Sequence, residues 1–159
     1  KPGILFRDIA PLFLQPTLVN QIVDHMAEKI ATWKCDAIAG LETRGYLLGV
    51  TLALKLNKPF IIIRKAGKLP KPTHSMKYDL EYGSAEIEIP QGAIQKDWNV
   101  IVHDDLLATG GTAGAAAELV SIAGGKVSGF LFLIELTGLK GNEKLSKYGA
   151  PIYSMLEYD

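Results

Sequence analysis

Two adjacent acids stand at the end of an apolar run, directly before a turn of small residues. Asp104 and Asp105 follow the mostly apolar residues 100–103, and 108–112 reads Ala-Thr-Gly-Gly-Thr. Neighbouring carboxylates repel each other, so burying both requires a cation or hydrogen-bond donors. Ribose hydroxyls supply donors, and Mg²⁺ supplies charge. The alternative is a solvated strand end whose acids cap a helix.

The turn that follows the acids has few side-chain atoms, which suits an anion. Its members are Ala108, Thr109, Gly110, Gly111 and Thr112. Glycines let backbone N–H groups approach a ligand closely, and the threonines add hydroxyl donors. A helix is expected to start directly afterwards, with its unpaired N–H groups and positive dipole end facing the turn. The turn therefore predicts a phosphate site, and its alternative is an ordinary strand–helix turn with a threonine cap.

The elements that must position these residues alternate along the chain. Helical spacing of apolar residues predicts helices at 17–33, 44–56 and 112–123. Short apolar or alternating runs predict strands at 37–40, 60–63, 85–89, 99–103, 127–134 and 152–156. This order predicts an α/β fold with a mainly parallel central sheet flanked by helices. Ligands of such folds bind beyond the carboxyl ends of the strands, where the two acids are expected.

Two further segments have a pattern of their own. Residues 64–82 are polar, rich in Gly, Pro and Lys, and without periodicity, which predicts an irregular lid loop. Arg64, Lys65 and Lys68 lie at its start and offer positive charge to an anionic ligand; the alternative is a solvated basic turn. Residues 85–89 alternate between apolar and polar types, which predicts a strand with one face in water.

Composition limits the classes of protein that fit. The 159 residues, 48% of them hydrophobic, suit a single domain, 1–159. Lys and Arg number 17, as do Asp and Glu, so no overall charge favours a nucleic-acid or membrane partner. No apolar run is long enough to span a bilayer. Cys35 is the only cysteine, which fits a reducing compartment, and we expect a cytoplasmic protein.

The apolar strand, the two acids and the Thr-Gly-Gly-Thr turn together resemble the phosphoribosyl pyrophosphate motif of the type I phosphoribosyltransferases. The two leucines between Asp105 and Ala108 resemble the branch of this family that uses adenine. Further similar stretches are 3–9, 38–45, 63–70, 80–83 and 135–141, so the resemblance covers essentially the whole chain.

The resemblance implies the type I phosphoribosyltransferase fold. In that fold residues 1–16 would form a small N-terminal hood that binds the base, and 64–82 a flexible lid loop. The implied reaction is purine salvage, in which adenine and phosphoribosyl pyrophosphate become AMP and pyrophosphate. The resemblance also implies Mg²⁺ as cofactor and a homodimer, with contacts near residues 40–50.

The same resemblance assigns roles to residues around the sugar phosphate. Arg44 would clamp the pyrophosphate, helped by the three cations at the start of the lid. Asp104 and Asp105 would hold the ribose hydroxyls, and the turn 108–112 would hold the 5′-phosphate. Mg²⁺ would be held mainly through substrate pyrophosphate and water, with the two acids as further candidate ligands. Taken alone, Arg44 is a surface arginine at a helix start.

The base and its proton fall to other residues. Phe6 would stack on the purine with Leu106 on its other face, while main-chain groups of Leu5 and Arg7 would bond the base edge. Glu81 would lie near the base N7 or its proton, and Tyr82 would steady the lid and help to orient the leaving group. Without the resemblance, Phe6 is a core residue and Glu81 an exposed strand residue.

Two local expectations come from the family pattern. The family often has a non-proline cis peptide in the loop that contains Arg44, and here it would join Glu42 and Thr43. His103 stands where the family prefers an aliphatic residue. We expect this histidine to be packed and neutral, although a charged one would add positive charge beside the acids.

Two other functions remain open. A regulatory protein could keep the nucleotide site without catalysis, but Glu81, Arg44 and an intact lid argue against it. A sister enzyme could use hypoxanthine or xanthine, but the stretch 5–9, Leu-Phe-Arg-Asp-Ile, and the two leucines after the acids argue against that reading.

Overall fold

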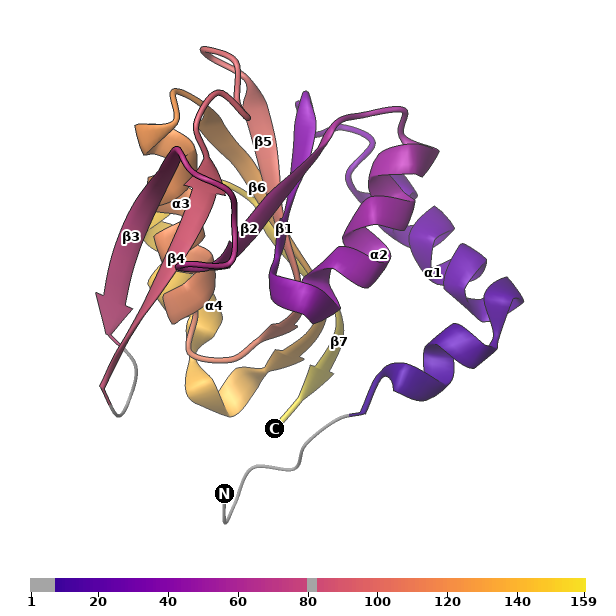
Figure 1. The fold of residues 1–159 in the computed structure, drawn as a ribbon. Helices are drawn as coiled ribbons and strands as arrows, with labels where there is room; N and C mark the ends of the chain where they lie inside the picture. The colour runs from indigo at the N-terminus through magenta and orange to yellow at the C-terminus, as the bar shows by residue number, and fades with distance from the viewer. Residues whose placement is uncertain (1–7, 80–82) are drawn as a thin grey trace.

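The structure is a computed structural model that describes residues 8–79 and 83–159 (Figure 1). Its strands form one seven-stranded sheet in the order β3-β4-β2-β1-β5-β6-β7. The elements are η1 Ala10–Leu14, α1 Pro16–Lys29, β1 Ala37–Leu41, α2 Glu42–Lys55, β2 Phe60–Lys65, β3 Thr73–Asp79, β4 Ser84–Pro90, β5 Asn99–Leu107, α3 Gly111–Ile122, β6 Lys126–Leu136, η2 Thr137–Leu139, α4 Gly141–Leu145, η3 Ser146–Tyr148 and β7 Ile152–Tyr158.

The strand directions bring the functional ends of the strands to one edge. Strands β2, β1, β5, β6 and β7 pair in parallel, and β4 joins β2 in the antiparallel direction. The predicted α/β fold with a mainly parallel sheet is therefore confirmed. Because β1, β2 and β5 are parallel neighbours, the segments that follow them emerge at the same edge of the sheet.

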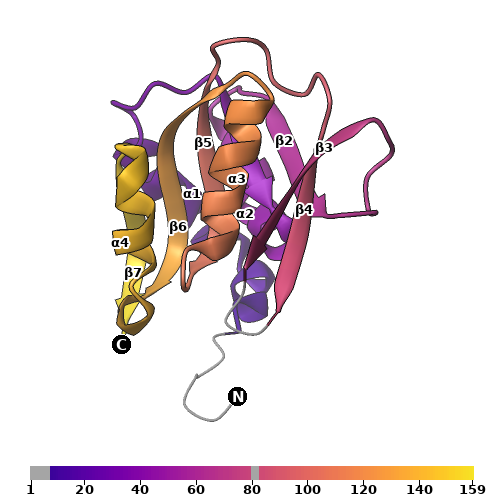
Figure 2. The ribbon, with the colours of Figure 1, turned by 90° about the vertical axis from the view of Figure 1, so that its left-hand side faces the viewer.

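Helices cover both faces of the sheet (Figure 2). Strand β6 shows why: Phe130 and Phe132 pack in the core under α3, while Leu131 and Leu133 pack in the core under α1 and α2. Such alternation fixes which side chains each strand offers to each face. Among the described residues, no helix combines the length and the apolar character that a membrane crossing requires.

The predicted irregular lid, 64–82, is wrong for most of its described length. Strand β2 continues to Lys65, and β3 pairs with β4 in an antiparallel hairpin from Thr73 to Asp79. Met76 and Tyr78 point inward and pack against the core under α3, whereas Ser75 and Lys77 are exposed. This alternation was hidden by the Gly-, Pro- and Lys-rich residues before it. Within the described part of this segment, only 66–72 has the irregular backbone that was expected.

The predicted wet face of residues 85–89 also needs a correction, because Glu88 is 2% exposed. Its carboxylate accepts hydrogen bonds from the N–H groups of Lys68 and Leu69, at 2.9 and 2.8 Å, and from the Thr73 hydroxyl at 3.2 Å. Burial alone would raise the pKa of Glu88, but these hydrogen bonds outweigh it and lower the pKa. The loop between β2 and β3 is thus folded around a buried carboxylate.

Replacing this anchor should loosen the loop without unfolding the sheet. In Glu88→Gln, we expect tryptic cleavage after Lys68 to become faster at pH 7, on the order of 5- to 10-fold, because a charge-assisted set of bonds is weakened. Because its pKa is lowered, the ionised Glu88 carboxylate stabilises the fold at pH values above the ordinary glutamate range. This stabilisation is lost as pH falls through the folded-state pKa. The difference in unfolding free energy between wild type and Glu88→Gln should therefore shrink at acid pH.

Glu86 provides the matched control. It lies on the same strand and lines the same hollow as Glu88, beside Gly67 and Lys71. The loop bond at this position runs from the Ala66 N–H to the backbone carbonyl of Glu86, which Glu86→Gln retains. Equal cleavage rates in the two variants would contradict an anchoring role for the Glu88 carboxylate.

Candidate active site

The two acids lie near the end of β5, in the middle of the sheet. Asp105 is 4% exposed and Asp104 is half-buried, and the Asp105 N–H donates to Oδ1 of Asp104 at 2.8 Å. Burial, and next to it the charge of Asp105, raise the pKa of Asp104 well above its ordinary value. The alternative of two fully solvated acids is excluded, and the pair favours any partner that brings positive charge or hydroxyl donors.

The turn after β5 is held in close contact with the start of α4. Gly110 has φ of 73°, and a Cβ there would lie 2.8 Å from the carbonyl oxygen of Gly141. A Cβ on Gly141 would lie 2.3 Å from the carbonyl oxygen of Ala108. The turn then enters α3 at Gly111, whose first N–H groups have no partner within the helix. The turn is therefore close-packed at the start of α3, and its use as an anion site stays a prediction.

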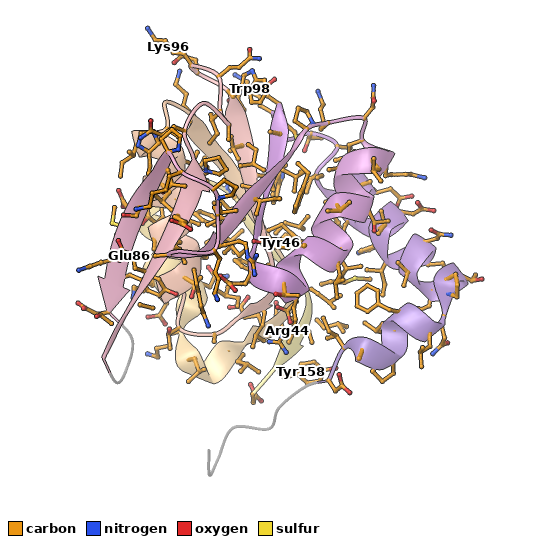
Figure 3. All side chains as sticks on the ribbon, in the orientation of Figure 1. Arg44, Tyr46, Glu86, Lys96, Trp98 and Tyr158 are labelled. Atoms are coloured by element: carbon orange, nitrogen blue, oxygen red, sulfur yellow. The ribbon has the colours of Figure 1, made fainter. Side chains whose placement is uncertain are left out.

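Arg44 joins the start of α2 to the acids near the end of β5. It lies in the first turn of α2 (Figure 3), and its Nε is 3.1 Å from Oδ2 of Asp105. The arginine side chain is 39% exposed, whereas that of Asp105 is 6% exposed. The sequence predicted both residues for one ligand, and the structure brings them together as an ion pair that faces solvent on the arginine side.

The predicted cis peptide between Glu42 and Thr43 is wrong, because this bond is trans and the cis peptide within the described ranges is Lys71–Pro72. Glu42 itself has φ of 49°, which makes the tight turn from β1 into α2. The Glu42 carboxylate accepts a hydrogen bond from the Lys65 N–H. The start of α2 is thereby tied to the end of β2.

The three predicted lid cations differ in burial and in place. Arg64 is half-buried, and its buried Nε has no hydrogen-bond partner among the described residues. Lys65 and Lys68 are exposed, the first beside Glu42 and the second on the loop that Glu88 anchors. Arg64 and Lys65 therefore approach the Arg44 segment, while Lys68 stands farther along the chain on a fixed loop.

His103 is packed and neutral, as the sequence predicted. It is completely buried, and Nδ1 lies 2.9 Å from the carbonyl oxygen of Leu131. A carbonyl can only accept, so Nδ1 carries the proton. Burial lowers the pKa of His103 to about 4. The histidine therefore adds no positive charge beside the acids at neutral pH.

The residues expected to bind the base are only partly within the described chain. Leu106 is half-buried on β5, next to Asp105, and packs against the core under α1 and α2. The other predicted base-side and lid residues lie outside the described residues: Leu5, Phe6, Arg7, Glu81 and Tyr82.

Two residues that contact the turn were not predicted from the sequence. Gly141 begins α4 against the carbonyl of Ala108, and the Tyr78 hydroxyl lies 3.1 Å from the Thr112 hydroxyl. The alternation of Met76 and Tyr78 with exposed residues was the available signal for the second. For Gly141 the sequence holds no signal beyond its place in the similar stretch 135–141, because its contact with Ala108 joins distant parts of the chain.

Comparison with known proteins places this site in a family. The model of the phosphoribosyl transferase domain matches residues 13–157. An adenine phosphoribosyltransferase of Ureaplasma parvum serovar 3 is 46% identical over 158 residues, covering 99% of this chain and 90% of that protein. One of Maridesulfovibrio salexigens is 49% identical over 146 residues, covering 92% and 86%.

Solved structures agree with the sequence matches. The crystal structure of the Thermoanaerobacter pseudethanolicus adenine phosphoribosyltransferase has a TM-score of 0.95 at 42% identity, covering 99% of this chain and 91% of that one. The Saccharomyces cerevisiae enzyme has a TM-score of 0.89 at 44% identity, covering 97% and 88%. The fold expected from the resemblance is confirmed, and the chain belongs to the phosphoribosyltransferase family and, within it, to the adenine phosphoribosyltransferases.

Proposed function

We propose that this chain converts adenine and phosphoribosyl pyrophosphate into AMP and pyrophosphate at the edge where β1, β2 and β5 end. The observation that carries the proposal is the meeting of three parts: the Asp104–Asp105 pair, the close-packed turn 108–112 at the start of α3, and Arg44 in contact with Asp105. Together they offer acceptors for a diol, donors for a phosphate and a cation for a second anion.

The sugar phosphate lies across these parts. Backbone N–H groups and hydroxyls of the turn 108–112 receive the 5′-phosphate, and Asp104 and Asp105 accept hydrogen bonds from the ribose hydroxyls. The paired oxygen donors fit Mg²⁺, because a hard divalent cation takes carboxylate, phosphate and water oxygens and offsets the repulsion at Asp104. When bound, Mg²⁺ would supply charge that neutralises the leaving pyrophosphate.

Pyrophosphate is bound by cations from the start of α2, from the end of β2 and from the loop after β2. Arg44 presents a planar guanidinium that matches phosphate oxygens, and it is already oriented by Asp105. The Nε of Arg64, which has no hydrogen-bond partner within 8–79 and 83–159, supports a second contact, and Lys65 and Lys68 add exposed charge. These residues stabilise the negative charge that grows on pyrophosphate as its bond to the anomeric carbon breaks.

The transfer exchanges one bond at the anomeric carbon for another. The bond to the pyrophosphate oxygen breaks, and a base nitrogen forms a new bond to the same carbon through an oxocarbenium-like transition state. Glu81 accepts the proton that the base loses, and Tyr82 helps to orient the leaving group. The lid, 64–82, excludes water when it closes.

The base is selected by the hood, residues 1–16, together with β5. Phe6 and Leu106 sandwich the purine, and main-chain groups of Leu5 and Arg7 pair with its 6-amino edge. A site that pairs buried groups with that edge rejects 6-oxo purines strongly. The Saccharomyces cerevisiae relative was solved with adenine, and a Trypanosoma brucei relative with AMP, pyrophosphate and ribose-5-phosphate, which supports these ligand classes here.

The proposal is tested by pyrophosphate release with phosphoribosyl pyrophosphate and Mg²⁺, using adenine, hypoxanthine, guanine and xanthine in parallel. We expect turnover with adenine and at least about 10⁴-fold lower kcat/KM with the 6-oxo purines. Turnover with a 6-oxo purine would show that the assignment of adenine as the substrate base is wrong. Binding of AMP without turnover of any base would favour a regulatory protein.

We further propose that the chain acts in the cytoplasm as a homodimer. Its single cysteine, Cys35, is free, which fits a reducing compartment. Three large apolar side chains of α2 are spaced on one helical face and exposed, namely Leu47, Val50 and Leu54, at 44%, 39% and 76%. Exposed apolar residues that gather on one face are typical of a subunit interface.

A charge on this face should separate the subunits. In Leu54→Asp, we expect the mass measured by light scattering at micromolar concentration to fall from a dimer to a monomer, because a carboxylate would be buried in an apolar contact. Leu14→Asp is the control, since Leu14 is 83% exposed but lies on η1. A wild-type monomer, or a dimer that persists in Leu54→Asp, would contradict this interface.

A further inference from the structure

Strand β3, which pairs with β4 in a hairpin, touches the proposed phosphate turn directly. The Thr112 hydroxyl donates a hydrogen bond to the Tyr78 hydroxyl at 3.1 Å. A Cβ on Gly111 would be 3.6 Å from both Cδ2 of Tyr78 and the carbonyl oxygen of Asp79. Figures 1 and 2 both show β3 running alongside α3, with its last residues near the start of that helix. The end of β3 and the phosphate turn are therefore neighbours.

The contact can adapt to an anion because each hydroxyl has one proton and also accepts. A phosphate oxygen only accepts, so Thr112 must give its proton to the phosphate if it binds one. The Tyr78 hydroxyl then donates to the oxygen of Thr112, and the direction of the bond reverses. A chain from Tyr78 through Thr112 to phosphate is stronger than separate bonds, because each polarises the next.

We propose that Tyr78 is a positioning residue that couples binding of the 5′-phosphate to the position of strand β3. It acts through Thr112 and, in this arrangement, does not touch the reacting atoms. Holding the end of β3 on the phosphate turn thus fixes where Thr112 presents its hydroxyl. The inference rests on the proposed function, because it takes the turn as the phosphate site.

The first test is the affinity for ribose 5-phosphate, measured by calorimetry on the full chain. In Tyr78→Phe we expect the Kd to rise about five-fold, the effect of one neutral hydrogen bond. The KM for phosphoribosyl pyrophosphate should rise by a similar factor, and the KM for adenine should stay unchanged. A purely structural role would not separate the two KM values.

Tyr148→Phe is the matched control. The Tyr148 hydroxyl also bonds to α3, donating to the carbonyl of Gly114 at 3.0 Å and lying 2.8 Å from Oε1 of Glu118. Loss of this hydroxyl removes a helix contact away from the turn, so the Kd for ribose 5-phosphate should not change. Equal Kd values for wild type, Tyr78→Phe and Tyr148→Phe, or an equal rise in both variants, would overturn the inference.

A double variant separates this coupling from independent effects. Thr112→Val removes the hydroxyl between Tyr78 and the phosphate, so adding Tyr78→Phe to it should cost no further affinity. Additive losses would show that Tyr78 acts without Thr112 and would overturn the inference. If wild type binds no ribose 5-phosphate at all, both the inference and the proposed function are overturned. If wild type binds ribose 5-phosphate and the Kd of Tyr78→Phe is unchanged, only the inference about Tyr78 is overturned.

Discussion

Asp104→Asn should lower kcat/KM for phosphoribosyl pyrophosphate roughly 30- to 150-fold, or about 2–3 kcal/mol, the range for a hydrogen bond to a charged group. The same variant should be more stable than wild type by about 1 kcal/mol at pH 7. Burial and the charge of Asp105 raise the pKa of Asp104, so its ionisation opposes folding. Asparagine keeps an oxygen that accepts from the Asp105 N–H but has no charge.

The pH dependence of this gain has a definite sign. A raised carboxyl pKa means that wild type loses stability as pH rises from the ordinary aspartate range through the folded-state value. Asp104→Asn has no such loss, so its advantage in unfolding free energy should vanish near pH 4 and grow toward neutrality. Chemical denaturation at several pH values measures it. A variant that is less stable than wild type at every pH would contradict the repulsion.

Asp97→Asn is the control for a charge change on its own. Asp97 forms an exposed ion pair with Lys126 at 2.8 Å, before β5 rather than at its carboxyl end. Exposed pairs contribute little, so both activity and unfolding free energy should stay close to those of wild type.

Gly110→Ala should damage both activity and stability. A side chain at φ of 73° is strained by about 1–2 kcal/mol, and the new Cβ would lie 2.8 Å from the backbone oxygen of Gly141. Neither backbone can yield alone, so the turn should shift and misplace its N–H groups. We expect kcat/KM for phosphoribosyl pyrophosphate to fall about 100-fold, as small displacements at a reacting site do. The unfolding free energy should fall by about 2–3 kcal/mol.

Gly149→Ala separates strain from close approach. Gly149 has φ of 66°, but a Cβ there would meet no atom of the described residues within 4 Å. It should therefore lose only the conformational part of the stability, about 1 kcal/mol, and retain full activity. If Gly110→Ala were as active as Gly149→Ala, the packing of the turn on Gly141 would have no functional importance.

The centre of the fold and of the site could be predicted from the sequence because the signals there are local. Val100, Ile101 and Val102 predict a buried strand, and the acids and small residues directly after them predict what its end offers. These residues are neighbours in the chain, so no knowledge of tertiary contacts was needed. The structure added the amount of burial and hence the raised pKa of Asp104.

The lid region was harder because its signals depend on distant partners. Glu88 was expected in water from its alternation with apolar neighbours, yet the loop that contains Lys68 and Leu69 folds over it. Strand β3 was missed because glycine, proline and lysine dominate the preceding residues, and its pairing with β4 decides its conformation. The ion pair between Arg44 and Asp105 likewise joins residues that no sequence period relates.

A crystal structure with AMP, pyrophosphate and Mg²⁺ would test the central claim most directly. We expect the 5′-phosphate within hydrogen-bond distance of the N–H groups of 109–112, the ribose hydroxyls on Asp104 and Asp105, and pyrophosphate beside Arg44. Electron density for AMP with its phosphate elsewhere, for example in the hollow between Tyr78, Lys144 and Lys147, would contradict the assignment of this edge of the sheet as the active site.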